Sequence, residues 1–167
     1  MAQEKQLLLA AFLDERFEMK YFLEYKAIFS TTEWEEERER IIHRVLEKDN
    51  NNAHTLAQIY IEEKFFDRLL DLLLQKQKER YSGNLIHTYG HHLHDHFPKE
   101  MLAIYEPMLV NQASNAGSRS DYYKVASELK DLLEIKGGRK IFVKLLKEFK
   151  TQYVRRPAMM DELRWVL

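Results

Sequence analysis

Residues 55–67 read Thr-Leu-Ala-Gln-Ile-Tyr-Ile-Glu-Glu-Lys-Phe-Phe-Asp, and they are the clearest guide to the architecture of this chain. Leu56, the small residue Ala57 and the aromatic Tyr60 share one face of a predicted helix. A tight turn is expected next, because another apolar run of helical period starts at Phe65. The stretch therefore predicts two helices that pack against each other across a very short turn.

Amphipathic helices are predicted along nearly the whole chain, since apolar residues recur at helical spacing in one segment after another. Most of the 5 Gly and 3 Pro stand between these segments. The expected helix boundaries are the hydroxyl cap at Ser30, the Asx run 49–52, the turn 82–84, Pro98, the loop 115–120, Gly137-Gly138 as a C-cap, and Pro157. Pro107 should kink or shorten the helix that Pro98 opens.

The predicted apolar faces define the expected core. Leu69, Leu73, Leu129 and Phe142 should be buried, and the same faces also carry Leu46, Leu74 and Leu133. The pattern is all-α, with roughly eight to ten helices and no β-sheet.

Length and composition limit the class of protein. A chain of 167 residues is expected to form one all-helical domain over 1–167, and a hydrophobic fraction of 45% suffices for a packed core. The formal net charge of -1 provides no global field to attract phosphate polymers or anionic lipid. The lack of cysteine excludes a disulfide framework and a thiolate nucleophile, and leaves zinc only histidine and carboxylate ligands.

No apolar run approaches the roughly 20 residues of a membrane span. The longest run, 7–13, follows Lys5 as in a signal peptide, but Asp14 and Glu15 stand where a cleavage site would need small residues. We interpret the run as a core helix and expect a cytoplasmic protein.

Successive helix pairs are predicted to start near His54, Gly83 and Asp121, at separations of 29 and 38 residues. These separations bracket the period of about 34 residues of tetratricopeptide repeats. The sequence therefore favours stacked antiparallel helix pairs in a right-handed, tetratricopeptide-like α-α superhelix over a four-helix bundle.

Three segments carry a family resemblance. They are Phe97-Pro98-x-x-x-Leu102-x-x-Tyr105, Arg119-x-x-Tyr122-Tyr123-x-x-Ala126-x-x-Leu129, and Phe142-x-x-Leu145-x-x-x-Phe149-x-x-x-Tyr153-x-Arg155-Arg156-Pro157-Ala158-x-x-x-Glu162-Leu163. This pattern resembles the helical C-terminal region of bacterial SWIM zinc-finger proteins. The family's Cys-x-Cys…Cys-x-His zinc module has no counterpart here, because the chain has no cysteine. The resemblance implies a fragment of a longer protein, or a relative that lacks the finger.

A histidine cluster is the main candidate for metal chemistry. His87, His91, His92, His94 and His96 fall on one predicted helix, where His87 with His91 and His92 with His96 form i, i+4 pairs. The chain has no His-Glu-x-x-His motif. We interpret these histidines as surface and stripe-edge residues and expect no metal site.

Other catalytic signatures are missing from the sequence. Gly137-Gly138 is not followed by the Gly-Lys-Ser/Thr of a phosphate loop, and no nucleophile elbow occurs. The paired carboxylates Glu62-Glu63 are expected on a solvated helix face. We therefore expect no enzyme, no catalytic residue and no cofactor.

Basic charge is concentrated near the end of the chain. Eight cations lie within 21 residues, against the single acid Glu148: Lys136, Arg139, Lys140, Lys144, Lys147, Lys150, Arg155 and Arg156. They could follow a phosphate backbone, or form a solvated face that balances the acidic segment 33–39. Nucleic-acid binding by this chain alone is not expected.

Two functions remain open. The first is a non-catalytic helical-repeat scaffold for protein–protein interaction, which would bind a protein or peptide through Arg119, Tyr123 and Lys124, with Arg155 and Arg156 as further candidates. The second is an accessory domain of a nucleic-acid-associated zinc-finger protein whose finger lies outside this chain.

Overall fold

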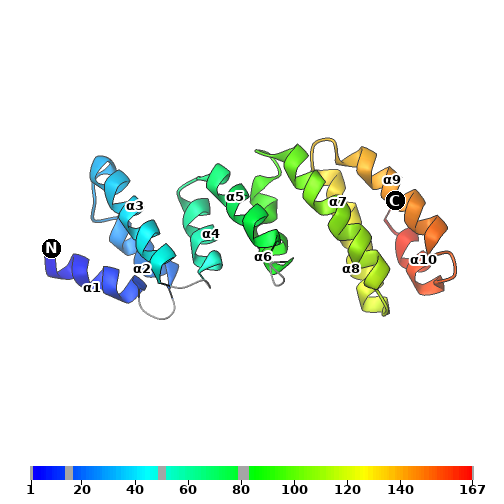
Figure 1. Cartoon of the computed structure of the whole chain (residues 1–167), viewed down its shortest axis with the longest axis horizontal. Coiled ribbons are helices and arrows are strands. Elements are labelled where there is room, and N and C mark those ends of the chain that lie inside the picture. The colour runs from blue at the N-terminus through cyan, green and yellow to red at the C-terminus, as the bar shows by residue number, and fades with distance from the viewer. Residues whose placement is uncertain (1, 14–16, 49–51, 79–82, 167) are drawn as a thin grey trace. The chain divides into compact units, whose positions relative to one another are not determined.

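The computed structural model describes residues 2–13, 17–48, 52–78 and 83–166, which form helices and contain no β-strand (Figure 1). In chain order the described elements are α1 (Ala2–Leu13), α2 (Met19–Lys26), α3 (Thr31–Glu47), α4 (Ala53–Glu62), α5 (Phe66–Gln77), α6 (Gly83–Tyr89), the 3-10 helix η1 (Gly90–Leu93), α7 (Pro98–Asn115), α8 (Arg119–Asp131), the 3-10 helix η2 (Leu132–Glu134), α9 (Gly138–Gln152) and α10 (Pro157–Arg164). The all-α prediction and the expected number of helices are confirmed for the described residues.

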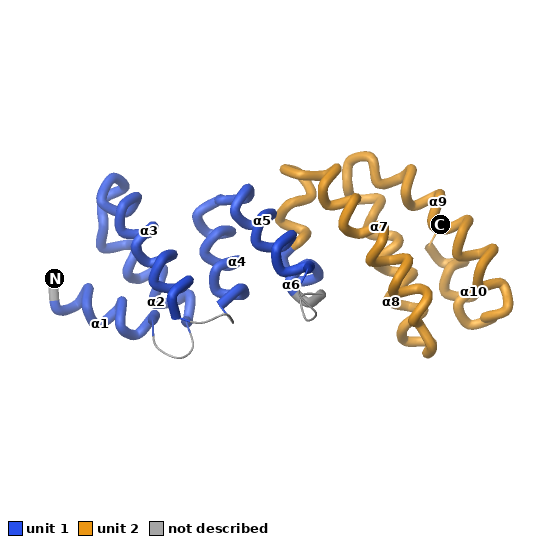
Figure 2. The backbone as a smooth tube through the Cα atoms, viewed as in Figure 1, with its two compact units in different colours: residues 1–89 blue, residues 90–167 orange. Residues whose placement is uncertain are grey.

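The chain divides into two compact units, Met1–Tyr89 and Gly90–Leu167 (Figure 2). The predicted single domain over 1–167 stays a prediction. Within each unit a helix contacts both its neighbour in sequence and the next helix but one: α4 contacts α2 and α6, α9 contacts α7, and α10 contacts α8. This contact pattern is typical of stacked helix pairs, each of which covers the apolar face of the pair before it.

Aromatic rings join the first three helices of unit 1. Phe22 of α2 lies 5.4 Å from the ring of Phe12 in α1 and 5.4 Å from the ring of Trp34 in α3. All three side chains are buried. Helix α3 starts at a capping box, as the hydroxyl of Ser30 predicts, with Ser30 and Glu33 bonded to each other.

The predicted tight turn after α4 is confirmed, and its backbone bonds explain why it is so short. The N–H of Phe65 donates to the carbonyl of Tyr60 at 2.7 Å, and that of Lys64 donates to Ile61 at 3.1 Å. Lys64 adopts a left-handed conformation, with φ of 58°. Together these features form a Schellman motif, which ends one helix and redirects the chain within two residues.

Glu63, in the same turn, is surrounded by donors from α2 and α3. Its carboxylate lies 2.8 Å from the ammonium of Lys26, accepts from Trp34 Nε1 at 3.1 Å and from Arg38 at 3.3 Å, and is only 4% exposed. The interpretation of Glu62-Glu63 as a solvated pair is therefore wrong for Glu63. A buried carboxylate is tolerated here because each neighbouring helix supplies a donor.

Unit 2 has a core to which α7, α8, α9 and α10 all contribute. Leu129 and Phe142 are 0% and 3% exposed, and in unit 1 Leu69 and Leu73 are both 0% exposed, so the four core predictions are confirmed. By contrast, Leu46, Leu74 and Leu133 are exposed, because each lies at the edge of its apolar face and no neighbouring helix covers it.

Several boundaries differ from the sequence prediction. Helix α6 ends at Tyr89 and a 3-10 turn follows. Only glycine fits at position 90, since a Cβ there would lie 2.4 Å from the hydroxyl of Tyr105. Helix α7 continues through Pro107 to Asn115 without being shortened, and the loop 115–120 contracts to three residues.

Gly137 has a different role from the one predicted. It is left-handed, with φ of 88°, but it is the N-cap of α9 rather than the C-cap of the preceding helix, which already ends at η2. The Asx run at 49–51 and Ser82 lie outside the described residues.

Replacing Glu63 with Gln should destabilise the protein by about 2 kcal/mol, because Lys26 and Arg38 would lose their shared anion in a largely buried site. The matched control is Glu62→Gln, which removes a carboxylate 3.0 Å from the same Lys26 but one that is 38% exposed, and which should change stability by less than about 0.5 kcal/mol. Urea denaturation followed by circular dichroism measures both changes. Equal effects of the two substitutions would contradict the role of Glu63.

The core assignment is tested by a second pair of variants. Leu129→Ala should cost about 2–5 kcal/mol because it leaves a cavity, whereas Leu133→Ala, at a side chain 42% exposed, should cost under about 1 kcal/mol. The same denaturation assay compares them, and a loss below about 0.5 kcal/mol for Leu129→Ala would show that the core is misassigned.

Candidate interaction surfaces

Two large aromatic side chains of unit 2 are mostly exposed. Tyr123 of α8 is 64% exposed, and Trp165, which directly follows α10, is 83% exposed. Helices α8 and α10 contact each other and run in the same direction (Figure 1). We call the surface made by Tyr123, Trp165, Arg119 and Glu162 the aromatic face.

An ion pair joins the two helices that present these aromatic residues. Arg119 Nε donates to the carboxylate of Glu162 at 3.0 Å, which ties the start of α8 to α10. Tyr123 is four residues after Arg119, and Trp165 is three residues after Glu162. Each ring therefore lies about one helical turn beyond the ion-pair residue on its own helix.

The start of α8 is held firmly. Asp121 and Ser118 form a capping box, in which the carboxylate accepts from the Ser118 hydroxyl at 2.7 Å and from the Ser118 N–H at 2.9 Å. The hydrogen bond from the Ser118 hydroxyl, with those from two backbone N–H groups, lowers the pKa of Asp121. The capping box therefore fixes the first turn of α8, just before Tyr123.

The structure separates the five predicted binding residues into two groups. Arg119, Tyr123 and Lys124 lie together on α8. Arg156 instead donates to the carbonyls of Ala113 and Ala116 at 3.3 and 3.0 Å, so it satisfies the end of α7 and has a structural role. Arg155, beside it, is exposed.

Sequence reasoning missed Trp165. Its signal was available, because Trp165 falls off the apolar stripe of Met160, Leu163 and Val166, and a large aromatic residue off the stripe points to solvent.

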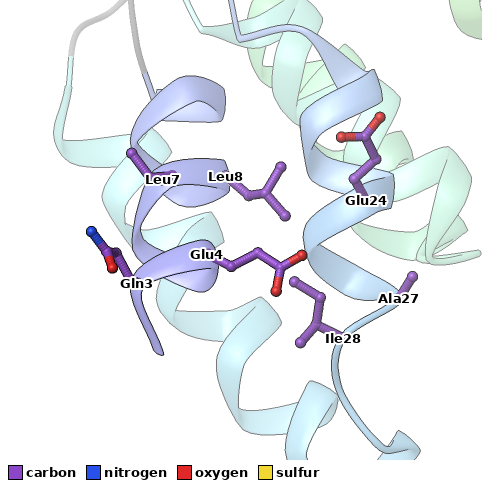
Figure 3. Close-up of a pocket in the computed structure, with 7 residues that line it drawn as sticks. All are labelled: Gln3, Glu4, Leu7, Leu8, Glu24, Ala27 and Ile28. Atoms are coloured by element: carbon purple, nitrogen blue, oxygen red, sulfur yellow. The ribbon is translucent and has the colours of Figure 1, made fainter. Parts of the chain in front are cut away.

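A groove lies between α1 and α2 in unit 1. Leu7, Leu8 and Ile28 contribute its apolar surface, and the carboxylates of Glu4 and Glu24 lie along it (Figure 3). Leu7 is 66% exposed, so the interpretation of 7–13 as a core helix is wrong for this side of α1; only Phe12 of the run is fully buried. Lys5, which does not line the groove, places its ammonium 3.8 Å from the ring centre of Phe29. We call this the acidic groove.

A second apolar groove runs along α9 in unit 2. Phe142, Val143 and Leu146 line it together with Lys147 and Lys150, and Val143 is 55% exposed. We call this the basic groove.

Part of the predicted cationic stripe on α9 is used within the fold. Lys144 donates to Glu106 of α7 at 2.6 Å, and this hydrogen bond raises the pKa of Lys144. Lys140 and Lys147 are exposed.

The histidines do not share one helix, because α6 ends at Tyr89. His91 and His92 lie in or next to η1 with their rings 4.0 Å apart, and His94 Nε2 is 3.0 Å from the hydroxyl of Tyr105. Across the described ranges, no three His, Asp or Glu side chains are arranged to hold a metal ion. Burial raises the pKa of Tyr105 to about 12.

Comparison with known protein families, curated proteins and solved structures gives no match to this chain. The resemblance to SWIM-associated helical regions therefore rests on its three motifs alone. In the described part of the chain, no helix has the length and apolarity to cross a membrane.

His94 makes stability depend on pH. Burial, followed by the nearby charge of His91, lowers the pKa of His94 below 6.5, the value expected in an unfolded chain. The unfolded chain therefore binds a proton at His94 more tightly than the folded chain does. The contribution of neutral His94 to the free energy of unfolding is complete above the unfolded pKa and is lost as the pH falls through the lowered pKa of the folded state.

His94→Gln, which keeps a polar partner for Tyr105, should reduce the fall in melting temperature between about pH 7.5 and pH 5.5. His43→Gln, at an exposed site, is the control and should leave that fall unchanged. Thermal denaturation at both pH values measures the difference, and an identical pH dependence in wild type and His94→Gln would refute the assignment.

Proposed function

We propose that this chain is a non-catalytic helical-repeat scaffold that binds a protein or peptide partner through the aromatic face. The observation that carries the proposal is the exposure of Tyr123 and Trp165, each about one helical turn beyond the Arg119–Glu162 ion pair that joins α8 to α10. Tyr, Trp and Arg are the residues most enriched among those that dominate binding energy at protein interfaces.

The aromatic face also suits binding energetically. Aromatic side chains bury roughly 150–250 Å² each on contact and have few rotatable bonds, so they lose little conformational entropy. The capping box at Ser118 and the bond from Arg119 to α10 hold the backbone beneath Tyr123 in place before a partner arrives.

A tetratricopeptide-like, right-handed superhelix is part of the same proposal. It is supported by the contacts between next-but-one helices within each unit and by the Schellman turn between α4 and α5. A bacterial origin, a cytoplasmic location and a link to SWIM zinc-finger proteins are proposed on the three sequence motifs and the composition.

The alternative is an accessory domain of a nucleic-acid-associated protein. Its supporting observation is the exposure of Lys140 and Lys147 on α9. Such lysines would bind nucleic-acid phosphates without recognising the base sequence, and the affinity for nucleic acid would fall steeply with rising salt concentration.

The test uses peptides selected from a display library against the full chain, then titrated by fluorescence anisotropy. Tyr123→Ala and Trp165→Ala should each weaken binding of the selected peptides by about tenfold or more. The wild-type affinity for these peptides should change little between low and physiological salt. Val110→Ala, which truncates an aliphatic residue 41% exposed on α7, is the control and should bind as wild type does.

Duplex DNA serves as the second ligand in the same titration. Submicromolar DNA binding that persists at physiological salt would defeat the scaffold proposal and favour the alternative. Peptide affinities unchanged in both aromatic variants would show that the aromatic face is not the binding site.

A further inference from the structure

The two grooves are complementary in charge and alike in their apolar surfaces. We propose that this protein associates head to tail with a second copy of itself, so that the basic groove of one copy docks in the acidic groove of the next. The proposed contact uses neither Tyr123 nor Trp165, and it is thus independent of partner binding at the aromatic face.

In the acidic groove, the two carboxylates are spread along its length. Glu4 of α1 lies toward Ile28, and the carboxylate of Glu24 extends from α2 farther along the groove (Figure 3). Glu4 and Leu8 are one helical turn apart on α1, about 6 Å along its axis. Lys20 is 3.8 Å from Glu24, and both side chains are well exposed, so solvent screens this internal pair.

On α9, apolar residues and cations alternate in a matching way. Lys147 follows Val143 by four residues, and Lys150 follows Leu146 by four, so each ammonium lies one turn beyond an apolar side chain. Lys147 and Lys150 are about 4.5 Å apart along the helix axis, so the two ammonium groups lie within one turn of each other along the groove that Val143 lines.

The fold already uses this chemistry where α9 packs on α7. There Lys144 donates to Glu106 at 2.6 Å beside an apolar helix contact. A helix that lays an apolar face into a groove between two helices is a common recognition mode, and flanking ion pairs set its register. Docking of Val143 against Leu7 and Leu8 would bury two exposed side chains: Val143 is now 55% exposed and Leu7 is 66% exposed.

The proposed contact is heterologous, because it joins two different surfaces. Each added copy therefore offers a free acidic groove on unit 1 or a free basic groove on unit 2, and the assembly grows with concentration unless it closes into a ring. Raised salt should weaken the contact, since the flanking charges are at the surface.

The experiment is a charge swap on the full chain, read by sedimentation velocity over a range of concentrations. The first variant, Glu4→Lys with Glu24→Lys, makes both grooves basic; the second, Lys147→Glu with Lys150→Glu, makes both acidic. Each alone should lose at least about tenfold in association constant, because like charges then meet. Mixing the two variants should restore association, because every contact between unlike variants again joins an acid to a base.

The control is Lys99→Glu on α7 with Lys130→Glu on α8, two exposed lysines that line neither groove; it changes the net charge by the same amount as Lys147→Glu with Lys150→Glu and should associate as wild type does. Circular dichroism checks that all variants keep their helix content, and Leu7→Ser, which alters no charge, should also weaken association. Wild type that stays monomeric at every concentration would overturn the proposal, and so would a mixture of the two swapped variants that fails to associate.

Discussion

The carboxylate of Glu63 is the interaction around which unit 1 is organised. It sits in the turn between α4 and α5, where a left-handed Lys64 reverses the chain, and it is nearly closed off from water by α2 and α3. An anion in such a place is stable only if cations and N–H donors converge on it. Lys26, Trp34 and Arg38 do so. In this way the short turn after α4 fixes the positions of α2 and α3.

The same constraint operates in unit 2 with the charges reversed. The guanidinium of Arg156, in the turn between α9 and α10, donates to two carbonyls at the end of α7 and lies over the ring of Tyr153 at 4.7 Å. Helix ends leave carbonyls without intrahelical donors, and a neighbouring turn supplies the donor. In both units, therefore, a charged side chain from one helix pair completes the hydrogen bonding of another.

Local sequence signals account for most of the fold. Apolar spacing identified the helices and the buried positions Leu69, Leu73 and Leu129, and the hydroxyl of Ser30 marked the start of α3 correctly. The errors have non-local causes. At Gly90, where α6 gives way to a 3-10 turn, Tyr105 from fifteen residues further along leaves no room for a side chain. Glu63 is buried because of donors 25 to 37 residues away, which its own neighbours in sequence do not reveal.

The interaction surfaces were less predictable for the same reason. Tyr123 and Lys124 were named as candidates from the sequence, whereas Trp165, which also falls off its apolar stripe, was overlooked. Sequence could not show that Arg156 bonds the backbone of α7, because that role depends on how the helices pack. Nor could it pair Glu4 with Glu24 across one groove, since they are on different helices.

The two tryptophans of this chain lie in opposite environments, and each unit contains one of them. Trp34 is 5% exposed with its indole N–H bonded to a carboxylate, whereas Trp165 is 83% exposed. Indole emission shifts to longer wavelength in water, so Trp165 is expected to emit at longer wavelength than Trp34. The protein thus contains a built-in optical reporter for each unit: the short-wavelength band follows the opening of unit 1, and the long-wavelength band follows events at the surface of unit 2.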